Sequence, residues 1–246
     1  MRLQVLNPNT SAAMTAQIAA AARAAAATGT EIVAAGSTCG PMSIESAFDE
    51  ALALPGLLQA LRAGQGQGVQ GHVIACFGDP GLDAAREVAD APVIGIAEAA
   101  MQVAALLAPR FAIVTTLERT VGTAERLVTR YGHERRCTAV RATGLPVLAL
   151  ERAAEDPTLY AQVEAECRRA LDADRAEAIV LGCAGMAPLA ARLAQALQVP
   201  VIDGVVAAVK LAEALAGARW RTSKRGDWAA PPAKPMAGQI AQFVLS

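Results

Sequence analysis

Two stretches of the sequence are copies of one pattern: "PVIGIAEAAMQVAALLA" runs from Pro92 to Ala108, and "PVIDGVVAAVKLAEALA" runs from Pro200 to Ala216. Aligned without a gap, they share eight of seventeen positions. Each is a short apolar run that continues into a helix-forming tract, which is the strand-to-helix order of α/β proteins. Because alanine matches are common in an alanine-rich chain, the spacing is the stronger evidence for a duplication.

Two further features repeat with nearly the same spacing. "RLQVL" starts at Arg2 and "RFAIV" starts at Arg110, which is the same separation in sequence as that of Pro92 and Pro200. The separation of Cys76 and Cys183 is one residue shorter. Strand-like runs alternate with longer helix-like runs along the chain, as expected for parallel sheets flanked by helices. The sequence therefore predicts an α/β fold of two pseudo-symmetric lobes, each a parallel sheet flanked by helices. The active site is expected in the cleft between the lobes.

Cap and turn residues predict where individual elements begin. In the first half we expect strands at 3–6, 31–35 and 72–75. The cap-type residues Asn9, Thr10 and Ser11 precede an expected helix over 12–27. Ser46 and Asp49 resemble a capping pair at the start of a second helix. Asp79 and Pro80 predict a third helix start, with Asp79 as the cap and Pro80 at the first helical position. The proline-rich stretch Ala229–Pro235 is expected to be an extended loop.

Charge and hydropathy exclude several classes of protein. The 246-residue chain has a net charge of −1, so no overall field attracts it to nucleic acid or to anionic membranes. Its most apolar region, Ala91–Leu107, contains Glu98 and Gln102, which argues against a membrane span. The basic stretch Arg219–Arg225 is expected to be a solvated loop. Met1–Leu6 leads directly into a strand-like pattern, so no signal peptide is expected.

The five cysteines form no Cys-x-x-Cys pair, which argues against a zinc site and a disulfide framework. We therefore expect a reducing, cytoplasmic setting and no bound metal. Gly66–Gly71 reads "GQGVQG", the glycine pattern of dinucleotide-binding loops. In those loops the glycines follow a strand and open a helix, whereas here they precede a strand-like run. We interpret the stretch as a helix-to-strand loop, and no nicotinamide cofactor is expected.

Cys76 and Cys183 each follow a strand-like run where the backbone turns toward a helix. Free N–H groups and the positive end of a helix stabilise a thiolate, so we expect the pKa of each thiol to be lowered toward neutrality. Racemisation needs such a pair, because one group removes a proton from a carbon and the other returns one to the opposite face. The alternatives are two inert core cysteines, a disulfide, or metal ligation. No His or carboxylate at ligand spacing supports the last.

The other cysteines and both histidines lack this context. Cys39, Cys137 and Cys167 have no counterpart in the repeat. His72 is expected at the entry end of its strand and His133 in a polar loop, both as structural or solvated residues.

A set of motifs resembles the Asp/Glu/hydantoin racemase family: "NPNT", "GPMSIES", "ACFGDPGLDAARE", "PVIGIAEAAM", "LGCAGMA", "VPVIDG" and "TSKRGDWAAPP". Within the family, "CFGDPGL" and "IAEAAM" are most similar to the hydantoin racemases, and to those that act on allantoin in particular. The resemblance runs from Leu3 into the C-terminal tail. It implies a cofactor-independent, two-thiol racemase in a cleft between two lobes, with a small-molecule substrate. It also implies a homo-oligomer whose C-terminal segment returns to the first lobe.

Carried over residue by residue, the resemblance assigns the acid/base pair to Cys76 and Cys183. It places substrate-binding groups on loops of both lobes, at Asn9, Ser43, Ile44, Phe77, Gly78, Thr115, Thr116, Ala184 and Gly185. The backbone N–H groups that follow each cysteine are expected to bind the carbonyl oxygens and the developing enolate.

The chain departs from the glutamate and aspartate racemases of the family beside both thiols. Those relatives follow the thiols with Asn-Thr and Thr-His, whereas this chain has "FG" at 77–78 and "AG" at 184–185. It also has "NPN" at 7–9 where they place Asp-Ser. Fewer ionic groups favour an uncharged five-membered diamide. The prediction is a racemase of 5-substituted hydantoins, with allantoin favoured.

Two other functions stay open: an amino-acid racemase for aspartate or glutamate, and a non-catalytic two-lobed protein that binds a small molecule. Decarboxylation or cis–trans isomerisation on the same scaffold is a further alternative, which the second cysteine disfavours. The expected lobes are residues 1–98 plus 210–246, and residues 99–209.

Overall fold

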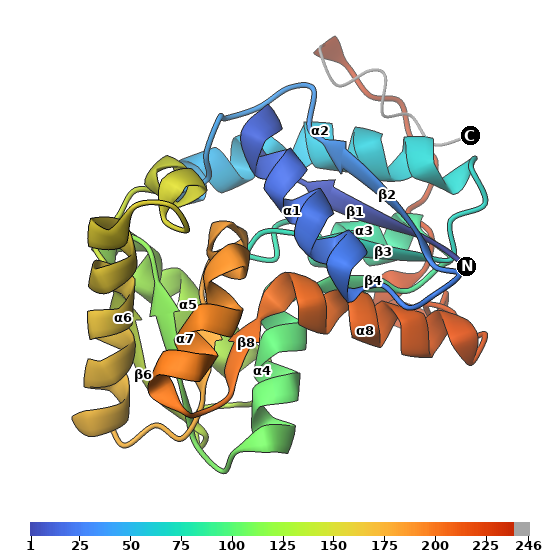
Figure 1. Ribbon diagram of the computed structural model, residues 1–246. Helices are drawn as coiled ribbons and strands as arrows, with labels where there is room; N and C mark the ends of the chain where they lie inside the picture. The colour runs from blue at the N-terminus through green and yellow to red at the C-terminus, as the bar shows by residue number, and fades with distance from the viewer. Residues whose placement is uncertain (239–246) are drawn as a thin grey trace.

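A computed structural model describes residues 1–238 and contains two parallel sheets of four strands each, in the orders β2-β1-β3-β4 and β6-β5-β7-β8. The strands are β1 (Arg2–Asn7), β2 (Glu31–Gly36), β3 (Gly71–Ile74), β4 (Val93–Gly95), β5 (Phe111–Thr115), β6 (Cys137–Ala142), β7 (Ile179–Leu181) and β8 (Val201–Asp203). Figure 1 shows the sheets in two lobes with helices around them. The predicted two-lobed α/β fold is confirmed.

The helices connect successive strands, as parallel pairing requires. They are α1 (Ala12–Ala25), α2 (Ala47–Gln65), α3 (Leu82–Val88), α4 (Ile96–Leu107), α5 (Glu118–Arg130), α6 (Pro157–Asp172), α7 (Ala190–Leu197) and α8 (Gly204–Gly217). Three 3₁₀ helices add η1 (Val147–Arg152), η2 (Ala184–Leu189) and η3 (Gly226–Trp228). The "GQGVQG" stretch is a loop between α2 and β3, as interpreted above.

Polar caps start the first two helices, as predicted. The Ser11 side chain accepts the N–H of Met14 at the start of α1, and the Ser46 side chain accepts the N–H of Asp49 at the start of α2. Such caps satisfy N–H groups that have no partner within the helix, which stabilises each helix start by about 1 kcal/mol. Helix α1 ends two residues before the expected Ala27.

The sequence repeat corresponds to a structural repeat. β4 and β8 begin at Val93 and Val201, and α4 and α8 begin at Ile96 and Gly204, so both pairs of elements keep the spacing of the sequence repeat. In each lobe the first strand lies between the second and the third, and the fourth strand lies at the edge. One strand order is therefore used twice.

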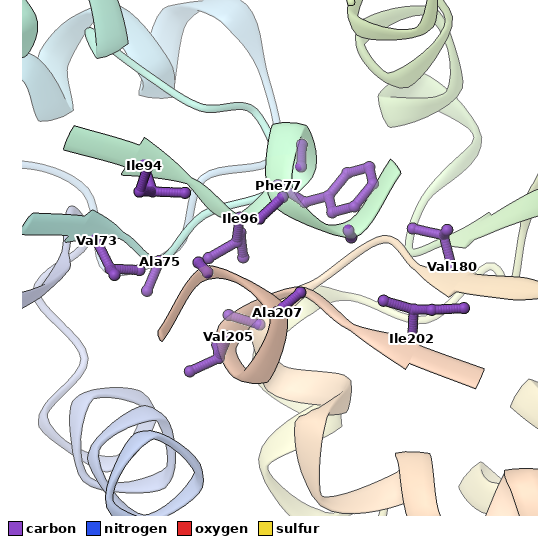
Figure 2. Packing of buried hydrophobic residues seen from close by; sticks show 14 of the residues in the cluster. Val73, Ala75, Phe77, Ile94, Ile96, Val180, Ile202, Val205 and Ala207 are labelled. Carbon is purple, nitrogen blue, oxygen red and sulfur yellow. The ribbon is translucent and has the colours of Figure 1, made fainter. Parts of the chain in front are cut away.

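A single hydrophobic cluster joins the lobes. Its members include Val73, Ile94, Ile96, Val180, Ile202 and Val205, which come from both sheets and from helices α4 and α8 (Figure 2). Gly204 permits the close approach of the two helices, because a Cβ there would lie 2.7 Å from the carbonyl oxygen of Ile96. Full burial of one such aliphatic side chain stabilises the fold by roughly 1.5–3 kcal/mol. The shared core therefore fixes one lobe against the other.

Several hydrogen bonds cross between the lobes, including the following two. The Glu45 carboxylate, just before α2, accepts the N–H of Val147 at the start of η1 at 2.7 Å. The Tyr131 hydroxyl, at the end of α5, donates to the carboxylate of Asp79 at 2.7 Å. Both contacts involve loops at the carboxyl ends of the strands, where ligands bind in open α/β sheets.

The C-terminal segment returns to the first lobe, as the resemblance implies. Thr222 donates its N–H to the carbonyl of Asp90, and the Trp228 indole N–H donates to Asp83 at the start of α3. Ala229–Pro235 forms neither helix nor strand. The domain boundaries after residues 98 and 209 fall inside α4 and α8 and stay a prediction. Residues 239–246, which belong to the predicted first lobe, lie outside the described residues.

Candidate active site

The first thiol stands on a tight turn after β3. The N–H of Asp79 donates to the carbonyl of Cys76 at 3.0 Å, and the N–H of Gly78 hydrogen-bonds to the Cys76 sulfur. Phe77 turns into the shared core, where it is 7% exposed (Figure 2). The turn thus anchors an apolar side chain on one side and leaves the thiol partly exposed.

The predicted helix start at Asp79 and Pro80 is wrong. Helix α3 begins at Leu82, with Gly81 at the cap position. The Asp79 carboxylate instead accepts the backbone N–H groups of Ala97 and Glu98, at 3.0 and 2.9 Å, in the first turn of α4. Asp79 has a φ of 44°, so the chain leaves the turn in a left-handed conformation and does not begin a helix there. Asp79 is a helix cap, but for α4, the helix that follows α3.

The second thiol stands directly before η2. Gly182 follows β7, and Cys183 occupies the cap position of η2, whose Gly185 N–H hydrogen-bonds to the Cys183 sulfur. Gly182 has to be a glycine, because a Cβ there would lie 2.8 Å from the Cβ of Thr115 on the neighbouring strand. Both cysteines therefore stand at the carboxyl edge of their own sheet, as predicted.

Both thiols line one cavity of about 70 Å³ between the lobes. Eight of the nine predicted binding residues line it as well: Asn9, Ile44, Phe77, Gly78, Thr115, Thr116, Ala184 and Gly185. Ser43 does not. The structure thus brings the thiols and the predicted loops together, whereas the role of each residue stays a prediction.

Several of these polar side chains already have partners inside their own loops. The Asn9 side-chain oxygen accepts the N–H of Ser11 at 2.9 Å, and the Thr115 and Thr116 hydroxyls lie 3.0 and 3.3 Å from the hydroxyl of Thr120. They shape the loops around the cavity. Among the described residues, no hydrogen bond uses the Nδ2 group of Asn9, which stays available to a substrate.

The pKa of both thiols is raised, which corrects the lowering expected from the sequence. Burial raises the pKa of Cys76 to about 12 and that of Cys183 to about 11. The hydrogen bonds from Gly78 and Gly185 act in the expected direction but are outweighed by the cost of taking a thiolate out of water. No α-helix begins directly beside Cys76, since α3 starts only at Leu82.

Two carboxylates in the cavity were missed by the sequence analysis. Glu45 and Glu50, at the start of α2, both line the cavity. Burial raises the pKa of Glu50, whose charge also raises the pKa of Cys76. The Ser46–Asp49 cap was the available signal, because it places the residues on either side of it at the mouth of the predicted crevice.

The charged side chains that line the cavity are all acidic. No Lys, Arg or His lines the cavity among residues 1–238. Within the same range, no three His, Cys, Asp or Glu side chains are grouped as a metal site. Nor does any helix in that range have the length and apolar character needed to cross a bilayer.

Comparisons with known proteins identify relatives of this chain in sequence and in fold. A profile of the family described as Asp/Glu/Hydantoin racemase matches residues 3–212. The chain is 52% identical to a hydantoin racemase from Rhizobium meliloti, over 97% of this chain and 98% of that protein. It is 47% identical to a hydantoin racemase from Pseudomonas sp. (strain NS671), over 99% and 97%. The structure is similar to that of allantoin racemase from Klebsiella pneumoniae, with a TM-score of 0.96, 55% identity and 99% coverage of both chains.

Proposed function

The chain belongs to the Asp/Glu/hydantoin racemase family, and from this premise we propose that it racemises 5-substituted hydantoins, with allantoin preferred, without a cofactor. As a racemase it is an isomerase. The observation that carries the proposal is that Cys76 and Cys183, from equivalent places in two lobes, line one cavity.

The proton transfers balance between the two sulfurs. One cysteine, as thiolate, takes the proton from C5 of the ring, and the electrons of that C–H bond move into the C4 carbonyl to form an enolate. The other cysteine, as thiol, returns a proton to the opposite face of C5 and becomes the thiolate. The opposite enantiomer runs through the same steps with the roles exchanged.

This mechanism needs one thiolate and one thiol at the same time. The charge of Cys183 raises the pKa of Cys76, so ionisation of one sulfur disfavours ionisation of the other. The N–H groups of Gly78 and Gly185 stabilise whichever sulfur is charged. The backbone N–H groups of Phe77 and Ala184, which line the same cavity, are the donors that we assign to the enolate.

The charge of the cavity wall supports a neutral substrate. Aspartate and glutamate each carry two carboxylates, which would meet Glu45 and Glu50 with no cationic side chain among the described cavity residues. A hydantoin carries no charge, and its ring N–H groups are donors that a glutamate accepts. Glu50 has a raised pKa through burial and lies beside Gly78, so it is placed to accept such a donor.

Uptake of deuterium at C5 tests the proposal. The protein is incubated in heavy water with (S)-allantoin, L-5-benzylhydantoin, L-aspartate and L-glutamate in separate samples. Loss of the C5 or Cα proton is followed by NMR and optical rotation by polarimetry, with the spontaneous rate subtracted. We expect deuterium uptake and loss of rotation with allantoin first, then with benzylhydantoin, and neither with the amino acids.

Each of the other outcomes would assign a different function to this protein. Turnover of glutamate or aspartate without turnover of hydantoins would identify an amino-acid racemase. Thermal stabilisation by allantoin with no exchange at C5 would identify a binding protein.

We also expect a homo-oligomer, for which the exposed side chains of Phe48 and Leu106 offer apolar surface.

A further inference from the structure

The two lobes cap their equivalent helices in different ways. In the second lobe, Asp203 stands at the cap position of α8 and accepts the N–H groups of Val205 and Val206, at 3.2 and 3.1 Å. The sequence repeat aligns Asp203 with Gly95, directly before α4, and a glycine has no side chain that could form such a cap. The carboxylate that caps α4 comes from Asp79, on the turn that carries Cys76.

The fit between Asp79 and Gly95 is close. A Cβ on Gly95 would lie 2.2 Å from the Asp79 carboxyl carbon, so the space of a local cap is filled by the distant carboxylate. Asp79 is 3% exposed. Burial raises its pKa to about 6, and it is therefore charged at pH 8. A charged, buried acceptor with two backbone N–H donors holds its position firmly.

A second contact ties the same carboxylate to the other lobe. The Tyr131 hydroxyl, from the end of α5, donates to Asp79 at 2.7 Å. The Asp79 N–H closes the turn onto the Cys76 carbonyl. Asp79 is therefore joined to the first thiol, to the start of α4 and to the second lobe. Nothing comparable joins Asp203 to Cys183 among the described residues, since the two bonds that the Asp203 side chain accepts stay within its own helix start.

We propose that Asp79 is a positioning residue for Cys76: its carboxylate anchors the thiol turn to α4 and, through Tyr131, sets that thiol against the second lobe. Asp79 is not among the residues that line the cavity. This inference rests on the proposed two-thiol reaction for its kinetic consequence, but the placement of the Cys76 sulfur does not depend on which substrate is used.

The test compares Asp79→Asn and Tyr131→Phe with the matched control Asp203→Asn. Asparagine at 79 keeps one acceptor oxygen and turns an NH₂ group toward a backbone N–H donor, so one anchoring bond is lost. The control removes the equivalent cap without touching a thiol turn. Each variant is first checked for folding by circular dichroism and thermal unfolding.

Two readouts separate positioning from general destabilisation. The first is the rate of iodoacetamide alkylation at each cysteine, resolved by peptide mass spectrometry below the unfolding temperature. We expect Asp79→Asn to raise the ratio of Cys76 to Cys183 alkylation at least threefold, in part because it removes a charge that raises the pKa of Cys76. Tyr131→Phe keeps that charge and loses only the bond to the second lobe, so the smaller rise expected for it reports the position of the thiol. Asp203→Asn removes a charge that raises the pKa of Cys183, so it should lower the ratio of Cys76 to Cys183 alkylation and not raise it. This readout needs no activity, so it holds even if the proposed reaction fails.

The second readout is racemisation of allantoin. We expect Asp79→Asn to lower kcat at least tenfold with KM within twofold of the parent value, and Tyr131→Phe to lower kcat about threefold. A folded Asp79→Asn protein with unchanged kcat and an unchanged alkylation ratio would overturn the proposal. So would an equal loss in the Asp203→Asn control. If Asp79→Asn does not fold, the ratio of Cys76 to Cys183 alkylation in Tyr131→Phe decides whether the proposal holds.

Discussion

The two lobes share a strand order and differ in the polar groups placed on it. Gln4 pairs with His72 in the first sheet, with 2.8 Å between Oε1 and Nδ1, where the equivalent pair in the second sheet is Ala112 and Ile179. The negative charges of Glu50 and Asp79 raise the pKa of Cys76, as Glu45 and Asp203 do for Cys183. Duplication has therefore kept the backbone that presents each thiol and has let its surroundings diverge.

The divergence is compatible with a symmetric reaction. Two enantiomers have equal free energy in solution, so the equilibrium constant is one and kcat/KM is equal in both directions, whatever the two thiols are like. Unequal surroundings show up only in kcat and KM separately, and in exchange without inversion. The lobes are therefore best compared through measurements that see one thiol at a time.

Removing either thiol is expected to have the largest effect. Cys76→Ser and Cys183→Ser should each lower racemisation by about 10³-fold or more, because each removes one of the two proposed acid/base groups. Each variant should still exchange the C5 proton of one enantiomer with heavy water, and the two variants should prefer opposite enantiomers. NMR of each pure enantiomer measures this. Racemisation at parental rates in both variants would contradict the mechanism.

A change at the contact between α4 and α8 is expected to act on stability. Ile96 and Gly204 are equivalent positions that meet each other, and a Cβ at 204 would lie 2.7 Å from a backbone oxygen. Gly204→Ala should destabilise the fold by about 1–3 kcal/mol, as overpacking does. Denaturant unfolding measures the free energy. Gly217→Ala is the control in the same helix, since its Cβ would meet nothing closer than the end of the Met1 side chain at 3.9 Å. Equal effects at both positions would mean that the close approach is not what matters.

The pH dependence of thiol reactivity is expected to be the smallest effect and the sharpest test of the raised pKa values. With the pKa of Cys76 raised to about 12 and that of Cys183 to about 11, the thiolate fraction of each grows about tenfold per pH unit from pH 7 to 9. Alkylation by iodoacetamide should follow, with exposed Cys39 as an internal reference in the same digest. A plateau reached below pH 8 would instead support the lowered pKa expected from the sequence.

Periodicity, caps and spacing predicted most of the fold. The repeat of Pro92–Ala108 predicted two like lobes, and Ser11 and Ser46 marked true helix starts, because these signals are local. The helix start predicted at Asp79 and Pro80 was wrong because that signal is also local. Their local pattern is that of a helix cap, and only the fold shows which helix the carboxylate caps.

The site was predictable where its chemistry is carried by residue type, and not where it depends on burial. Two cysteines at equivalent strand ends predicted one cavity with two thiols. The sign of their pKa shift was wrong, because desolvation depends on everything packed around a group. Glu45 and Glu50 were missed because their place in the cavity depends on how the loop before α2 folds over the second lobe.

Both sulfurs that line the cavity belong to one polypeptide, and each half of the described residues supplies one of them. A half-length ancestor with one such sulfur would exchange a proton on one face of a carbon and leave its handedness intact. Under the proposed mechanism, fusion of two copies would make inversion an intramolecular event. It would no longer depend on two separate molecules meeting, and dilution would not weaken it.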